Sequence, residues 1–261
     1  MVWYLRLDLK KSALCALLLT IVTACGSVRE VLPSGDSFVA AAAAAARDPR
    51  TWTPLAGAAV IGVGGWDNDI SDWAADKTPV FGSQDRASKA SDDLLNVLVG
   101  GMAASSVLAP NQGRYDAFPA ARVAANALAF GGANAVVAGL KETVRRDRPN
   151  GSPDQSFPSG HSVAAFTSAY LIEQNLNESV RSPLARASIS AASIGLASTV
   201  AWARVEGDRH YPVDVLVSAA IGNFFARTFY KSFADTDGPE AIPVSMEAWR
   251  DGFALRFAKA F

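Results

Sequence analysis

Long apolar segments rich in alanine, glycine and serine follow one another through most of the chain, separated by prolines and clusters of polar residues. Segments of this length and composition favour helices, and the alternating pattern of a strand is nearly absent before the C-terminal end. Hydrophobic residues make up 50% of the sequence, which is enough to bury a sizeable core. We therefore expect an all-α protein built as a helical bundle.

The first helix is predicted at 37–48, with Asp36 or Ser37 as its cap and Pro49 after its end. A second apolar segment at 53–65 closes with glycines. Further helices are predicted at 93–108, 120–145, 160–175, 187–203 and 212–231.

Residues 66–92 are polar and are broken by Pro79 and Gly82, so we expect a loop with short helical pieces there. The C-terminal tail, 236–261, ends in a sequence that alternates around an Arg-Asp-Gly turn. This pattern predicts a small β-hairpin with an aromatic face. That face could pack on the bundle, or contact a bilayer or a partner.

The N-terminus has the pattern of a targeting segment. Three basic residues precede the apolar stretch ALCALLLTIVTA, which is too short to span a bilayer comfortably and ends at Cys25. The sequence VTAC resembles a bacterial lipobox, which predicts a signal peptide at 1–24, acylation of Cys25 and a tether at 25–36. Gly26, in place of an acidic residue, indicates the outer membrane by resemblance to lipoprotein sorting signals. An ordinary signal peptide with a chance cysteine is the alternative.

The net charge and the length of the apolar segments limit the kinds of partner that we expect. The net charge of −1 shows no basic excess of the kind that a nucleic-acid partner requires. The longest uncharged runs fall short of the ~20 residues of a membrane span, and Arg122 interrupts one of them. We favour a soluble bundle held at the membrane by its lipid, with an integral protein of short, tilted spans as the alternative. The oligomeric state is not defined by the sequence.

Three stretches gather the residues that can carry chemistry. In KETVRRDRP, Lys141 lies seven residues before Arg148, a spacing that places both cations on one helix face. PSGH places Ser159 and Gly160 immediately before His161. Each stretch also fits a plain structural role, because basic residues often make a solvated helix end and Ser-Gly often caps a helix.

The third stretch, ARVEGDRHYPVD, contains Arg204, His210 and Asp214. His210 and Asp214 are four residues apart and therefore one helical turn apart, and Pro212 suits the first turn of a helix. The pair alone could be structural. However, the only two histidines of the chain, His161 and His210, both fall inside these stretches.

Taken together, the stretches resemble the signature of the type 2 phosphatidic acid phosphatase superfamily, namely Lys-x6-Arg-Pro, Pro-Ser-Gly-His and Ser-Arg-x5-His-x3-Asp. That superfamily includes bacterial class A acid phosphatases, lipid phosphate phosphatases and vanadium haloperoxidases. The matching positions are Lys141, Arg148, Pro149, Pro158, Ser159, Gly160, His161, Arg204, His210 and Asp214. Ala203 stands where the family usually has serine. The resemblance implies a helical bundle of the acid phosphatase/haloperoxidase type, which we place at 37–235.

The resemblance also implies roles. Lys141, Arg148 and Arg204 would clamp a phosphate group, with the Ser159 hydroxyl and the Gly160 N–H as neutral donors. His210 would be the nucleophile that takes the phosphoryl group. Asp214 would hydrogen-bond the far nitrogen of that imidazole, and His161 would protonate the leaving oxygen and later activate water. No cofactor and no metal are implied.

We expect a phosphatase that acts on phosphomonoester or pyrophosphate groups of a membrane lipid through a phosphohistidine. The alternatives are a periplasmic acid phosphatase with soluble substrates, a vanadium-dependent haloperoxidase, and a catalytically silent interaction module. The complete set of His161, His210 and Asp214 argues against the silent module.

Overall fold

One central helix, α7 (Gly160–Asn177), organises the molecule. It packs against α5 (Gln84–Leu108), α6 (Pro119–Val144) and α8 (Pro183–Glu206), and it also packs against α9 (Pro212–Ala234). The computed structural model describes residues 33–109, 119–153, 155–177, 179–234, 244–249 and 252–257. Most side chains of α7 are buried because neighbours cover it on several sides. The predicted all-α bundle is confirmed.

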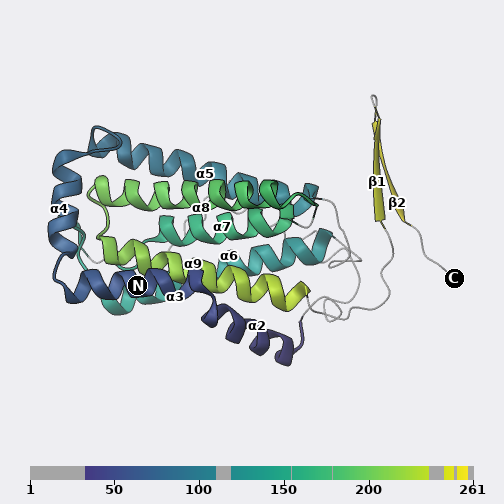
Figure 1. The fold of residues 1–261 in the computed structure, drawn as a ribbon, viewed down its shortest axis with the longest axis horizontal. Coiled ribbons are helices and arrows are strands. Elements are labelled where there is room, and N and C mark those ends of the chain that lie inside the picture. The colour runs from purple at the N-terminus through teal and green to yellow at the C-terminus, as the bar shows by residue number, and fades with distance from the viewer. Residues whose placement is uncertain are drawn as a thin grey trace, which may run out of the picture.

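Three further helices complete the bundle. α2 (Gly35–Arg47) and α3 (Pro49–Val63) pack along α9. α4 (Asp67–Lys77) lies across one end of the bundle, between the end of α3 and the start of α5 (Figure 1).

Local capping sets two helix starts differently from the sequence prediction. Asp48 accepts a hydrogen bond from the Arg50 N–H at 2.9 Å, and Pro49, which follows the end of α2 as predicted, also opens α3, so α3 starts before the predicted residue 53. Ser182 caps α8 in the same manner, with Pro183 in its first turn, so this helix starts before the predicted residue 187. Proline is favoured there because its missing N–H would have no partner in a first turn.

The segment 66–92 contains the helical pieces that we expected but less loop, because α4 and the first turns of α5 fill most of it. The buried face of these helices consists of small residues, such as Ser71 and Ala74 in α4 and Ala87 and Ser91 in α5. Such residues carry little hydrophobic signal, so the helical period is hidden in the sequence. Thr78, in the left-handed region at φ 40°, ends α4 directly before Pro79.

Two helices meet the requirements of the alternative named above, an integral protein that crosses a membrane. Residues Arg122–Val144 of α6 and Pro183–Glu206 of α8 are long and apolar enough, by length and composition alone. Arg122 does not interrupt the first of them, because it lies at one end of this span. Its buried guanidinium donates to the carbonyl oxygens of Ser106 at 2.8 Å and Ala109 at 2.5 Å.

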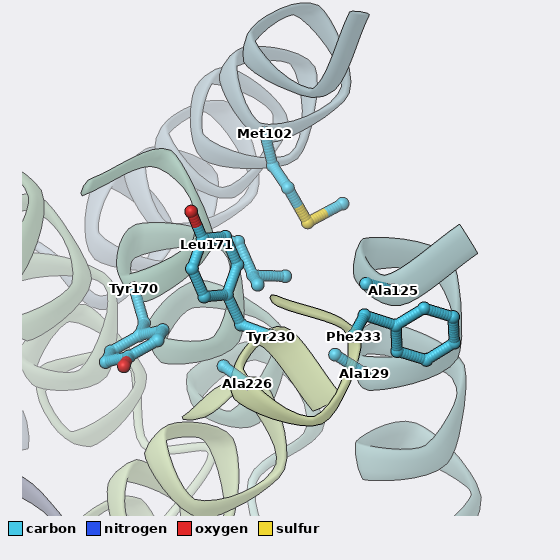
Figure 2. Close-up of a cluster of buried hydrophobic side chains, with 8 residues drawn as sticks. All are labelled: Met102, Ala125, Ala129, Tyr170, Leu171, Ala226, Tyr230 and Phe233. Carbon is cyan, nitrogen blue, oxygen red and sulfur yellow. The ribbon is translucent and has the colours of Figure 1, made fainter. Parts of the chain in front are cut away.

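The core combines one aromatic cluster with many alanines. Figure 2 shows the cluster, in which side chains of α5, α6, α7 and α9 meet. Its members are Met102, Ala125, Ala129, Tyr170, Leu171, Ala226, Tyr230 and Phe233. The alanines allow helices to approach closely where large side chains would hold them apart.

α9 approaches α7 closely at Gly222. A Cβ atom added there would lie 2.8 Å from the carbonyl oxygen of Val163 and 3.0 Å from the backbone nitrogen of Thr167. Only glycine therefore permits this crossing. The crossing matters for the site described below, because α7 and α9 begin at the same end of the bundle and each carries one of the histidines or its partner.

A β-hairpin lies near the C-terminus, as predicted. β1 (Val244–Trp249) and β2 (Gly252–Phe257) pair antiparallel, with Val244 opposite Phe257 and Trp249 opposite Gly252. The pair stands beside the helical body in Figure 1 and is not packed on it. Cys25 and most of the predicted tether lie outside the described residues.

A test of the α7–α9 crossing is the variant Gly222→Ala, which should lower the free energy of unfolding by about 1–3 kcal/mol because the methyl group must push two backbones apart. Gly195→Ala in α8 is the matched control, since no atom lies within 4 Å of its added Cβ. The control should be neutral or stabilising by up to ~1 kcal/mol. Thermal and denaturant unfolding would measure both, and equal stability of the two variants would contradict the close crossing.

Candidate active site

The three sequence motifs meet at the end of the bundle where α7 and α9 begin. The first motif follows the end of α6, the second opens α7, and the third joins α8 to α9. Contacts between them are direct. The Ser159 N–H donates to the Ser218 hydroxyl at 2.8 Å, and Arg146 and Ser156 both bind Asp214. The structure therefore brings together residues that are up to 73 positions apart, from Lys141 to Asp214.

Three cations line this end. Burial lowers the pKa of Lys141 to about 8, and the nearby charges of Arg148 and Arg204 act in the same direction. Burial also lowers the pKa of Arg204 to about 10, against the opposing charge of Asp92, while Arg148 and Arg209 add to the effect. These mutual effects show that the side chains of Lys141, Arg148 and Arg204 lie near one another.

Part of this cluster lacks partners. The Nε atoms of Arg148 and Arg204 are buried and have no hydrogen-bond partner among the described residues. Arg204 does donate from Nη1 to the Ser91 hydroxyl at 3.0 Å, and the Lys141 ammonium donates to the Gln155 carbonyl. Buried donors of this kind are normally satisfied, so two open guanidinium donors indicate a site for an anion with several oxygens.

His210 is 2% exposed and differs from the prediction in one respect. Its Nδ1 lies 2.6 Å from the backbone carbonyl oxygen of Ser156, whereas the nearest Asp214 oxygen is 3.8 Å away. The partner that fixes this nitrogen is therefore the Ser156 carbonyl, and Asp214 acts at longer range. A carbonyl oxygen can only accept, so Nδ1 carries the proton and Nε2 has the lone pair.

Burial lowers the pKa of His210 to about 4, with Arg204 and Lys141 contributing, against the raising effect of Asp214. The ring is therefore neutral near pH 7. A neutral imidazole with its lone pair on Nε2 has the protonation state that a nucleophile requires.

Asp214 is fully buried and holds several segments together. Its carboxylate accepts hydrogen bonds from the Ser156 hydroxyl at 2.5 Å and from the Tyr211 N–H at 3.0 Å. Arg146 binds it from Nη1 at 2.8 Å. Although burial tends to raise the pKa of Asp214, the hydrogen bonds and the Arg146 charge outweigh this effect and lower it.

Arg146 extends the network to α4. Its Nη2 lies 2.7 Å from an Asp67 oxygen, and its guanidinium lies 3.8 Å from the centre of the Tyr211 ring. Asp67 in turn accepts a hydrogen bond from the Val213 N–H at 2.8 Å, at the first turn of α9. The guanidinium is thus shared by two carboxylates and an aromatic face.

Ser159 and Gly160 form the start of α7. The Ser159 hydroxyl accepts a long hydrogen bond of 3.4 Å from the Ser162 N–H and a hydrogen bond of 3.0 Å from the Ser162 hydroxyl. It thus caps the helix, and its side chain is fully buried. The N–H groups of the first turn have no partner inside a helix, so the positive end of α7 lies at the cation cluster.

His161 is the more accessible histidine, with 34% of its side chain exposed. Its Nε2 lies 2.7 Å from the Oδ1 atom of Asp92 on α5. Burial lowers the pKa of His161, and Arg204 and Arg148 lower it further, whereas Asp92 raises it. Both imidazoles thus lie at the same cation cluster, in different surroundings.

Sequence reasoning missed four residues of this arrangement: Asp67, Asp92, Arg146 and Ser156. Asp67 and Asp92 lie in the segment that we expected to be a loop, and Ser156 acts through its backbone as well as its hydroxyl. Their contacts described above join residues that are 54 to 146 positions apart in the sequence. Only the neighbouring PSGH and RRDRP motifs pointed to Ser156 and Arg146.

The arrangement can bind an oxyanion, offer it a neutral imidazole and exchange protons through a second imidazole. Among the described residues, no group of three or more His, Cys, Asp or Glu side chains is placed to hold a metal ion.

Part of the chain is similar to known proteins. Residues 122–237 match the PAP2 superfamily. A solved structure, a transmembrane PAP2 type phosphatidylglycerolphosphate phosphatase from Bacillus subtilis, superposes with a TM-score of 0.51, covering 69% of this chain and 92% of that one at 22% identity. This likeness establishes the PAP2-type helical fold.

A lipid A 1-phosphatase from Porphyromonas gingivalis is 38% identical over 82 residues, which is 31% of this chain. The match spans only 17% of that relative's length.

The role of Arg146 can be tested by Arg146→Gln, which leaves the buried Asp214 without its guanidinium. We expect a loss of about 1–3 kcal/mol in the free energy of unfolding. The neighbouring variant Arg145→Gln removes the same charge, but Arg145 is exposed and its Nε donates only to the Glu142 carbonyl. This control should stay within about 0.5 kcal/mol of wild type. Equal unfolding midpoints for the two variants would show that the network does not hold the site.

Proposed function

We propose that the segment at residues 122–237, which matches the PAP2 superfamily, hydrolyses phosphomonoester or pyrophosphate groups of a membrane lipid through a phosphohistidine on His210. The observation that carries this proposal is the convergence of three cations and both imidazoles of the chain at one end of the bundle. A phosphoryl group carries charge on several oxygens, and catalysis of its transfer is mainly positioning and stabilisation of that charge.

In the first step, Nε2 of His210 attacks phosphorus while the bond to the leaving oxygen breaks. His161 gives a proton to that oxygen, so the alcohol or phosphate leaves neutralised. Lys141, Arg148 and Arg204 hold the remaining phosphoryl oxygens, and the open Nε donors of the two arginines are satisfied in this state. The Ser159 hydroxyl and the Gly160 N–H are proposed as further donors at the helix end.

In the second step, neutral His161 takes a proton from water, whose oxygen attacks phosphorus. The bond between phosphorus and Nε2 of His210 breaks, inorganic phosphate leaves, and both histidines return to their starting states. The Ser156 carbonyl keeps the Nδ1 proton of His210 in place throughout. Asp214 stabilises the positive charge that the ring acquires when it is phosphorylated.

Several observations support a lipid substrate at a membrane. The two proteins compared above are a lipid A 1-phosphatase and a phosphatidylglycerolphosphate phosphatase, and both names describe the removal of phosphate from a lipid. Two helices, α6 and α8, are apolar and long enough for contact with a bilayer. We propose that the chain is held at the outer membrane through acylated Cys25, with its site in the periplasm. The lipid anchor and the compartment rest on the sequence of the first 26 residues alone.

The test is a phosphate-release panel that compares lipid phosphates, a lipid pyrophosphate and p-nitrophenyl phosphate, with His210→Gln as the control. Wild type should favour a lipid substrate, and His210→Gln should lose at least ~10³-fold in kcat because no nucleophile remains. Label from a ³²P-phosphate substrate, quenched in alkali, should be found on wild type and not on the variant. Near-normal turnover by His210→Gln would refute the mechanism, whereas preference for the soluble ester would refute only the lipid substrate.

Anion binding should depend on pH through Lys141, whose pKa is lowered to about 8 by burial. Above this pH the free protein loses one cation of the cluster, so the Kd of inorganic phosphate should rise, by roughly tenfold per pH unit well above the pKa. Lys141→Arg keeps its charge over this range and should flatten the dependence. Calorimetric titration between pH 7 and 9.5 measures both, and an equally steep rise in the variant would assign the effect to another group.

A further inference from the structure

Asp92 is an acidic residue at a cationic site, and neither the motifs nor the matched domain accounts for it. It lies on α5, outside residues 122–237. Its Oδ1 is 2.7 Å from Nε2 of His161 and 3.9 Å from Nη1 of Arg204. The contact to His161 joins residues 69 positions apart, so it depends on how α5 packs against α7.

The turn of α5 that carries Asp92 is fixed in place. Its neighbour Ser91 is fully buried, donates to the Ser88 carbonyl at 2.7 Å and accepts from Arg204 at 3.0 Å. Ser88 is pressed against the end of α8, because a Cβ added to Gly207 would lie 2.8 Å from the Ser88 hydroxyl oxygen. The packing of α5 against α8 therefore sets the backbone position of Asp92.

A carboxylate can only accept, so the proton of this pair is on Nε2 of His161. The second nitrogen, Nδ1, has no hydrogen-bond partner among the described residues. In the doubly protonated ring, Nδ1–H is consequently the donor that is left for a leaving oxygen. Once that proton has gone, Nε2 keeps its own proton and Nδ1 has the lone pair needed to accept a proton from water.

We propose that Asp92 is the positioning residue of His161, whose hydrogen bond to Nε2 orients the ring, fixes its tautomer and opposes the loss of the proton that the leaving group needs. This inference rests on the proposed phosphatase function. In this proposal the two imidazoles have different hydrogen-bond acceptors, a backbone carbonyl for His210 and a carboxylate for His161. Burial keeps His210 neutral while the Ser156 carbonyl holds the proton on its Nδ1, and the Asp92 carboxylate favours the protonated form of His161.

The charges around His161 make this partner necessary. Arg204 from α8 and Arg148 from the segment after α6 both lower its pKa, in addition to burial, and Asp92 is the group that opposes them. Without Asp92 the ring would lie beside two guanidinium groups and would lose its proton at a lower pH. The acid form would then be scarcer at neutral pH.

The experiment compares Asp92→Asn with Asp93→Asn. Asp93 is adjacent, exposed and paired with Lys89 at 2.7 Å, so its variant makes the same charge change away from His161. Two substrates separate the acid from the rest of the site. Hexyl phosphate needs a proton on its leaving oxygen, whereas p-nitrophenyl phosphate releases a stable phenolate without one.

Asp92→Asn should lower kcat for hexyl phosphate by at least ~10-fold and change kcat for p-nitrophenyl phosphate far less, because a general acid typically contributes 10²–10⁴-fold. The alkaline limb of its pH profile should move to lower pH, and Asp92→Glu should recover part of the loss. Asp93→Asn should match wild type. Equal losses on both substrates, or a gain in activity, would overturn the proposal and make Asp92 a structural residue or an obstruction.

A titration followed by NMR tests the pair without turnover. The chain has 2 histidines, so two imidazole signals are expected, and His161→Asn assigns them. In Asp92→Asn the pKa of His161 should fall, while that of His210 stays in place. An unchanged pKa of His161 would overturn the proposal. A wild type that hydrolyses no phosphate ester would instead refute the proposed function, and the titration would still decide the contact.

Discussion

The buried carboxylate of Asp214 connects the segments on which the site is built. Ser156 and Arg146 reach it from the segment between α6 and α7, and Tyr211 reaches it from the loop before α9. Arg146 carries the connection on to Asp67 and α4. A carboxylate without partners is costly to bury, so these contacts must form together with the bundle. The close crossing of α7 and α9 at Gly222 supplies the scaffold that brings the segments within reach.

The cations beside this network have fewer negative charges and hydrogen-bond acceptors near them. Arg146 is shared by two carboxylates, whereas Arg148 and Arg204 keep buried Nε atoms without partners among the described residues. Burial lowers the pKa values of Lys141 and Arg204, and the neighbouring cations lower them further. A bound phosphate group would supply negative charge to these cations. A site of this kind is less stable without its ligand, and in return it binds the transition state more tightly.

The two histidines show how one small site can hold two imidazoles in different states. His210 is buried beside a backbone carbonyl, and its pKa is lowered to about 4. His161 lies at the start of α7 with part of its ring exposed and a carboxylate at its Nε2. The residues that create this difference, Ser156 and Asp92, are neither cations nor members of the Lys-Arg-His signature. They act by accepting hydrogen bonds, and this determines which nitrogen of each ring has a lone pair.

The sequence by itself determined the all-α class, most of the long helices and the identity of the clustered cations and histidines, because these follow from composition, helix propensity and the spacing of short motifs. It missed α4 and the start of α5, whose buried faces consist of alanine and serine and give no clear period. Only the tertiary structure decided that Ser156, and not Asp214, holds Nδ1 of His210, and that Arg146 and Asp92 belong to the site. These contacts join helices distant in the sequence, and the packing of one helix against another is set by the whole bundle and not by local pattern.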